Sequence, residues 1–128
     1  MGHTLKLRFH GAARTVTGSC HEFTCGPSRV LVDCGLFQGS RTLEGLNAGA
    51  FGFDPRKVDA VVLTHAHIDH SGLLPRLVAQ GFTGRIWCTQ PTADLLEYML
   101  ADAGRIQEAD VARRNRRRDR AGEEEFQP

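Results

Sequence analysis

Three histidines and one aspartate lie within a run of six residues, His65-Ala66-His67-Ile68-Asp69-His70. Imidazole nitrogens and carboxylate oxygens are the usual ligands of a catalytic zinc ion. Two such ions can convert a bound water into a hydroxide near neutral pH and hold a phosphoryl or acyl group. A lone histidine near a strand is usually structural, but four ligating groups this close together predict a hydrolytic metal site.

The residues around this run predict how its side chains are oriented. The apolar run 60–64 indicates a strand, and side chains two residues apart in extended chain point the same way, so His65 and His67 can reach one ion. If a helix follows, Asp69 and His70 turn toward a second ion about 3.5–4 Å from the first. Ser71-Gly72 allows the necessary bend. Apolar residues then recur at helical spacing, at Leu73, Leu74, Leu77 and Val78.

The rest of the chain predicts a mixed α/β fold. Alternating or short apolar runs, separated by glycine and proline, indicate strands. The first three of these strands would form an antiparallel meander. Residues 36–53 are expected to be irregular, and a long helix is expected from Pro91 onward. The predicted strands are 5–9, 20–24, 29–33, 60–64 and 85–89.

Two further stretches accompany the metal run. They are Gly11-Ala12-Ala13-Arg14-Thr15-Val16-Thr17-Gly18-Ser19 and Val30-Leu31-Val32-Asp33-Cys34-Gly35-Leu36-Phe37-Gln38-Gly39. Together with His70-Ser71-Gly72-Leu73-Leu74-Pro75, they resemble the β-CASP branch of the metallo-β-lactamase fold, a group of RNA-processing nucleases. The resemblance covers nearly all of the chain up to Arg118.

This resemblance implies a role for each matched residue. His65 and His67 would bind one zinc ion, and Asp69 and His70 would bind a second. Asp69 would also orient or deprotonate the attacking water. Asp33 would support the metal loop by fixing the orientation of the ligands. On the residues alone, Asp33 is better explained as a turn-forming residue.

The chain departs from the family after the metal run. Family members carry a further histidine, a bridging aspartate, a final histidine and a β-CASP insertion, but no histidine follows His70 here. We therefore expect the N-terminal half of an αββα sandwich, with residues 1–112 as part of a metallo-β-lactamase domain and residues 113–128 as a charged C-terminal segment. Such a half leaves an apolar face uncovered, which would suit the missing half of the fold or a second copy.

Six arginines lie between Arg113 and Arg120, followed by Glu123-Glu124-Glu125. A cluster of positive charge can bind phosphates. A charge run is also typical of a solvated helix face. Because no aromatic residue lies among the arginines to stack on bases, this segment is not a platform for single-stranded nucleic acid.

The composition is ordinary for a globular protein, with 41% hydrophobic and 24% charged residues. The net charge of +1 neither favours nor excludes nucleic acid. No signal-peptide pattern or long apolar span is present, which predicts a cytoplasmic protein with no membrane partner. The four cysteines form no Cys-x-x-Cys pair. Cys34, beside Asp33, is either a small buried residue or a ligand for a soft metal.

These observations lead to one principal hypothesis and two alternatives. The principal hypothesis is a zinc-dependent hydrolase that cleaves RNA with a water activated by two ions; endo- and exonucleolytic cleavage are not distinguished, and manganese or iron would suit the same ligands. The first alternative is a hydrolase of the same fold acting on a small thioester or lactam. The second is a truncated chain without activity of its own, whose parent protein is the enzyme.

Overall fold

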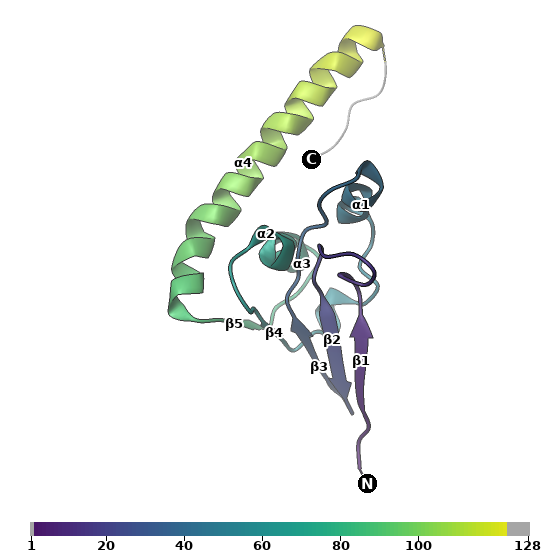
Figure 1. The fold of residues 1–128 in the computed structure, drawn as a ribbon, viewed down its shortest axis with the longest axis vertical. Coiled ribbons are helices and arrows are strands. Elements are labelled where there is room, and N and C mark those ends of the chain that lie inside the picture. The colour runs from purple at the N-terminus through teal and green to yellow at the C-terminus, as the bar shows by residue number, and fades with distance from the viewer. Residues whose placement is uncertain (1, 123–128) are drawn as a thin grey trace.

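The structure, a computed structural model that describes residues 2–122, is built on a five-stranded mixed sheet (Figure 1). Strands β1, β2 and β3 pair antiparallel, whereas β4 is parallel to β3 and β5 is parallel to β4. The predicted mixed α/β fold and its antiparallel meander are confirmed. The strands lie side by side in chain order: β1 (Leu5–Phe9), β2 (His21–Cys25), β3 (Ser28–Val32), β4 (Ala60–Val62) and β5 (Arg85–Trp87).

Strands β4 and β5 end two residues earlier than predicted. The reason at β4 is local: Leu63 still donates its backbone N–H to Trp87 O at 2.8 Å, but the next N–H, that of Thr64, donates to the carboxylate of Asp33 at 2.8 Å. Strand β4 therefore ends where the Asp33 side chain, and not the backbone of a neighbouring strand, accepts the next backbone hydrogen bond.

Within residues 2–122, six helices connect and flank the strands. The segment 36–53, predicted to be irregular, contains two of them, because Ser40 caps a turn there and its Oγ accepts from Leu43 N at 3.3 Å. The bend predicted at Ser71-Gly72 separates α2 from α3. The helices are α1 (Arg41–Gly45), the 3-10 helices η1 (Leu46–Ala48) and η2 (Pro55–Lys57), α2 (Ile68–Ser71), α3 (Leu74–Ala79) and α4 (Gln90–Ala121).

Helix α4 is 32 residues long and runs beside the rest of the chain before extending beyond it (Figure 1). Its only buried residue is Thr92. Residues 113–121 of the predicted charged segment continue this helix, whereas Glu123-Glu124-Glu125 lie outside the described residues. Among residues 2–122, no helix combines the length and the apolar character needed to cross a membrane.

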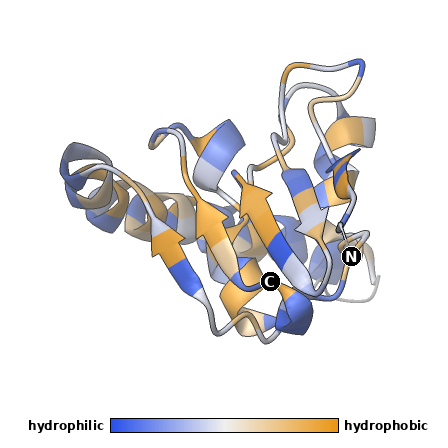
Figure 2. Cartoon of the chain, turned by 90° about the horizontal axis from the view of Figure 1, so that it is seen from below, coloured by the Kyte–Doolittle hydropathy of each residue, from blue (hydrophilic) through white to orange (hydrophobic). Residues whose placement is uncertain are grey.

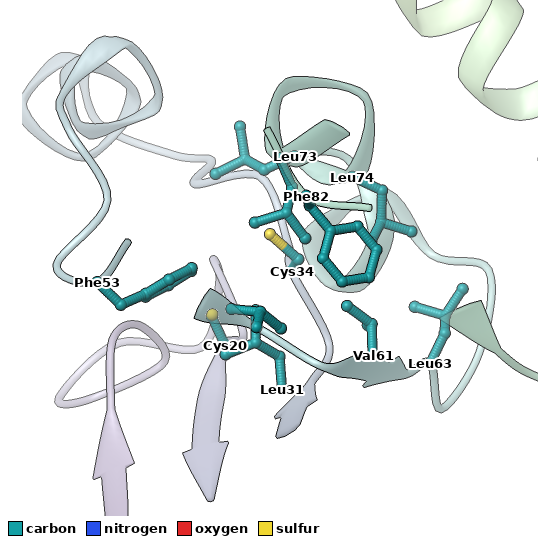
Figure 3. Packing of buried hydrophobic residues seen from close by; sticks show 11 residues of the cluster. Cys20, Leu31, Cys34, Phe53, Val61, Leu63, Leu73, Leu74 and Phe82 are labelled. Atoms are coloured by element: carbon teal, nitrogen blue, oxygen red, sulfur yellow. The ribbon is translucent and has the colours of Figure 1, made fainter. Parts of the chain in front are cut away.

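The core lies between the sheet and the helices that follow β4. Leu31 on β3 and Val61 on β4 pair in register and are fully buried against Leu77 of α3. Figure 3 shows further members of this cluster, including Cys34 beside Phe82. The helices thus cover one face of the sheet.

The opposite face of the sheet is apolar and exposed. Side chains two residues apart share a face, and the register aligns Phe9, Val32, Val62 and Trp87 across the strands, with His21 of β2 between Phe9 and Val32. Phe9 and Trp87 are 57% and 56% exposed. Figure 2 shows hydrophobic residues in several strands, alternating with hydrophilic ones, and also in the helices. Half of a sandwich would show this pattern.

Backbone hydrogen bonds join three segments at one end of the sheet. Ser19 N–H donates to Asp69 O at 2.9 Å, and Gly35 N–H donates to Ser19 O at 2.9 Å. Cys34 N–H donates to His70 O at 2.9 Å. Segments 18–20, 34–36 and 68–70 therefore form one network, and Gly35 lies at its centre, where a Cβ atom would be 1.6 Å from Asp69 O.

We expect Gly35→Ala to destabilise the chain by about 3 kcal/mol, because its methyl group meets backbone that cannot rotate away. Gly45→Ala is the matched control, since Gly45 has helical dihedral angles and nothing within 4 Å of the added carbon. It should change stability by no more than about 1 kcal/mol, toward stabilisation. Urea unfolding of the three chains measures both effects; equal midpoints for both variants would contradict this packing.

Candidate metal centre

The candidate site begins at Asp33, the first residue after β3. Its backbone lies in the left-handed region with a φ of 64°, which aspartate tolerates better than most residues. Its backbone N–H donates to Val62 O at 3.0 Å. This turn directs a side chain that is 2% exposed toward the loop after β4.

The buried carboxylate of Asp33 is surrounded by donors from that loop. Thr64 Oγ1 lies 3.0 Å from Oδ1 and 2.9 Å from Oδ2, and His70 Nδ1 lies 2.7 Å from Oδ2. Hydrogen bonds to a charged acceptor are worth about 1.5–3 kcal/mol each. Asp33 therefore forms the turn and also accepts hydrogen bonds from the loop.

The loop and α2 bring the predicted ligands together. The ring centroids of His65 and His67 are 4.7 Å apart, and those of His65 and His70 are 4.1 Å apart. Asp69 Oδ2 lies 3.4 Å from His70 Nε2. Helix α2 begins directly after His67, which places Asp69 and His70 in its first turn, as the predicted bend into a helix requires.

Two hydroxyl side chains whose hydrogen bonds the sequence did not predict support this loop. Ser71 is fully buried, and its Oγ donates to Ala66 O and His67 O, each 3.0 Å away. These hydrogen bonds connect α2 to the loop before it. Thr64 connects Asp33 to His65 Nδ1, which is 2.9 Å from Oγ1. The only signal for them in the sequence is a hydroxyl residue at each edge of the histidine run.

The donor chemistry of this loop fits a metal ion. Imidazole nitrogen and carboxylate oxygen are zinc ligands, and because Nδ1 of His70 faces Asp33, its Nε2 lies beside the Asp69 carboxylate, 3.4 Å from Oδ2. In residues 2–122, however, no group of three or more histidine, cysteine, aspartate and glutamate side chains is arranged to hold an ion. The loop therefore supplies ligand types and an orientation, but not a closed coordination shell.

Cys34 lies on the core side of Asp33 rather than among the histidines. It is completely buried and packs in the hydrophobic cluster. The pKa of Cys34 is raised far above its usual range, mainly by a hydrogen bond with the Cys20 thiol and to a smaller extent by burial. Because the thiolate is the metal-binding form, this environment favours the buried structural role of Cys34 over a ligand role.

The arginine-rich end of α4 is partly neutralised within the helix. Arg113 and Arg114 both pair with Asp110, with Arg114 Nε at 2.9 Å from its Oδ2. The hydrogen bond from Arg113 lowers the pKa of Asp110. The predicted phosphate-binding role of this segment rests on its charge alone.

The sequence was compared with protein families and with known proteins. Residues 28–126 match the metallo-beta-lactamase superfamily. A ribonuclease of Thermus thermophilus, TTHA0252, is 52% identical over 96 residues, which are 75% of this chain and 22% of that protein. A transcription termination factor FttA of Methanocaldococcus jannaschii is 37% identical over 98 residues, 77% of this chain and 16% of the relative.

An RNase J-like protein of the same archaeon is 37% identical over 90 residues, covering 70% of this chain and 19% of that protein. The chain thus spans about a fifth of the length of these relatives. The names of these relatives agree with the predicted β-CASP branch. Among solved structures, a metallo-beta-lactamase of Cronobacter sakazakii is 24% identical with a TM-score of 0.49, over 69% of this chain and 33% of that one; this likeness adds nothing to the family match.

We expect Asp33→Ala to lower the free energy of unfolding by about 3 kcal/mol, because it removes a charged acceptor and leaves alanine in a left-handed conformation. Asp33→Asn keeps one acceptor oxygen and tolerates the turn, so it should cost about half as much. Asp102→Ala, on the exposed side of α4, is the control and should be neutral. Chemical unfolding ranks the variants, and an Asp33→Ala chain as stable as the control would contradict the role of the carboxylate.

Proposed function

The chain belongs to the metallo-β-lactamase superfamily, and we propose that it forms the N-terminal part of a zinc-dependent hydrolase that cleaves RNA phosphodiester bonds. The observation that carries this proposal is the cluster of His65, His67 and His70, held at the end of the parallel strands by Asp33. Ligands are commonly bound at the carboxyl ends of strands in open α/β sheets. The metal-ligand types at that position point to hydrolysis.

In this proposal each residue of the loop has a defined task. His65 and His67 hold one ion, and Asp69 and His70 hold the second. When bound, the two ions would lower the pKa of a water and offset charge on the phosphoryl oxygens. The carboxylate of Asp69 would orient that water and accept its proton. Asp33 contacts Nδ1 of His70, on the opposite side of the ring from the nitrogen that would bind the ion, and this contact fixes the orientation of the ring.

RNA is proposed as the substrate because of the relatives. Their names describe a ribonuclease, an RNase J-like protein and a transcription termination factor. The loop itself does not select a phosphodiester over a thioester or a lactam. The arginines at the end of α4 add a basic segment suited to phosphates. We further propose that the protein is cytoplasmic, where such a substrate would be met.

The proposed activity belongs to the longer protein of which this chain would be one part. The described loop offers two ligands for each ion, whereas a catalytic zinc usually has three protein ligands. We propose that the remaining ligands come from elsewhere in the longer protein. This chain alone would then bind zinc weakly and would not cleave RNA.

We expect the longer protein to retain close to two equivalents of zinc after dialysis, and the 128-residue chain to retain less than one. His67→Ala should remove most of the bound zinc because it deletes a ligand, whereas His3→Ala, near the N-terminus, should not. Elemental analysis of the dialysed proteins gives these values. Full zinc content in His67→Ala would refute the ligand assignment.

We expect the longer protein to cleave a labelled RNA and to leave a thioester substrate intact. Asp69→Asn should slow cleavage by about 100-fold or more, because it removes the group that positions and deprotonates water. Asp102→Asn on α4 is the control and should keep full activity. Gel analysis of the RNA and a colorimetric thiol assay separate the two substrates, and thioester turnover without RNA cleavage would favour the small-molecule alternative.

A further inference from the structure

Thr64 lies between Asp33 and His65 and contacts both. Its Oγ1 is 2.9–3.0 Å from the two carboxylate oxygens of Asp33 and 2.9 Å from His65 Nδ1. Its backbone N–H donates separately to Asp33 Oδ1 at 2.8 Å. The hydroxyl therefore joins a buried carboxylate to a histidine that the proposed function makes a metal ligand.

The number of available protons sets the direction of these hydrogen bonds. A threonine hydroxyl has one proton to donate, and an ionised carboxylate only accepts. The hydroxyl proton must therefore go to Asp33, and Oγ1 must act as an acceptor toward His65. It follows that a neutral His65 carries its ring proton on Nδ1 and its lone pair on Nε2.

The same proton count applies to His70, which contacts the Asp33 carboxylate directly and not through a hydroxyl. Its Nδ1 is 2.7 Å from Asp33 Oδ2, so a neutral His70 also carries its proton on Nδ1. One carboxylate thus sets the tautomer of two histidines, His70 directly and His65 through a hydroxyl. In the neutral rings the lone pair is then on Nε2, and that of His70 lies 3.4 Å from Asp69 Oδ2, its proposed partner in holding the second ion.

We propose that Thr64 is a positioning residue that relays the hydrogen-bond direction of Asp33 to His65 and holds His65 in the Nδ1–H tautomer. Its consequence for zinc binding rests on the proposed function, but the tautomer itself does not, because it follows from hydrogen bonds within the chain. A residue that only closed the end of β4 would hold Asp33 in place and leave the tautomer of His65 unaffected.

The experiment compares Thr64→Val, which keeps the shape and loses the hydroxyl, with Thr64→Ser, which keeps the hydroxyl. The Thr64 backbone N–H still donates to Asp33 in both variants, so the carboxylate stays held. Long-range proton–nitrogen correlation spectra of the metal-free chain, at a pH where imidazoles are neutral, report the tautomer of each histidine. His21, which packs on Phe9, is the internal control.

We expect the Nδ1–H form of His65 in the wild-type chain and in Thr64→Ser. In Thr64→Val, His65 should shift toward the Nε2–H form, while His70 stays Nδ1–H through Asp33 and His21 does not change. In the longer protein, competition with a chelator should show zinc affinity about 10- to 100-fold lower in Thr64→Val. Thr64→Ser should restore an affinity within a few-fold of wild type.

Three results would overturn the proposal. These are a wild-type His65 in the Nε2–H form, a Thr64→Val chain whose His65 stays Nδ1–H, and simultaneous shifts of His65 and His70, which would mean that Thr64 only holds Asp33. The wild-type spectrum decides the first even if a variant does not fold. A wild-type protein that binds no zinc but shows the expected tautomers would reject the proposed function and leave this relay intact.

Discussion

The structure around the candidate site depends on one buried carboxylate. Asp33 is 2% exposed, and a charge removed from water in this way is tolerated only if its oxygens accept hydrogen bonds. The donors that satisfy it come from Thr64, directly before the histidine run, and from His70, its last residue. Satisfying the carboxylate therefore fixes both ends of the histidine run.

Sheet topology places this carboxylate where it can act. Strands β3 and β4 are parallel, so the residues that follow them, Asp33 and Thr64, leave the sheet at the same end. The network that joins segments 18–20, 34–36 and 68–70 then presses the turn after β3 against the first turn of α2. Gly35 makes this approach feasible because any side chain would overlap Asp69 O. Backbone packing and side-chain hydrogen bonds thus position the same loop independently.

Sequence reasoning anticipated the parts of this arrangement that depend on local pattern. The alternation of apolar residues predicted β1 with the bounds that the structure has, and the bend at Ser71-Gly72 was predicted from residue type. The histidine run was identified because its residue types are unusual at that spacing. The hydrogen bonds of the Thr64 and Ser71 hydroxyls were missed because hydroxyl residues are common, and their importance comes from partners that the fold brings to them. Asp33 was ambiguous for the same reason: its turn is local, but its contact with His70 spans 37 residues.

Under the proposed function, the exposed face of the sheet and the open coordination shell have a common physical origin. Phe9, Val62 and Trp87 lie on a face that nothing in residues 2–122 covers, and burying one large apolar side chain is worth about 1.5–3 kcal/mol. Under the proposed function, a second layer from the longer protein would cover this face and bring the remaining ligands to the loop. Because the loop lies where the strands end, the layer that packs on the strands also reaches the site. Folding energy from the sheet would then help to assemble the metal centre, which links stability of the whole protein to formation of its active site.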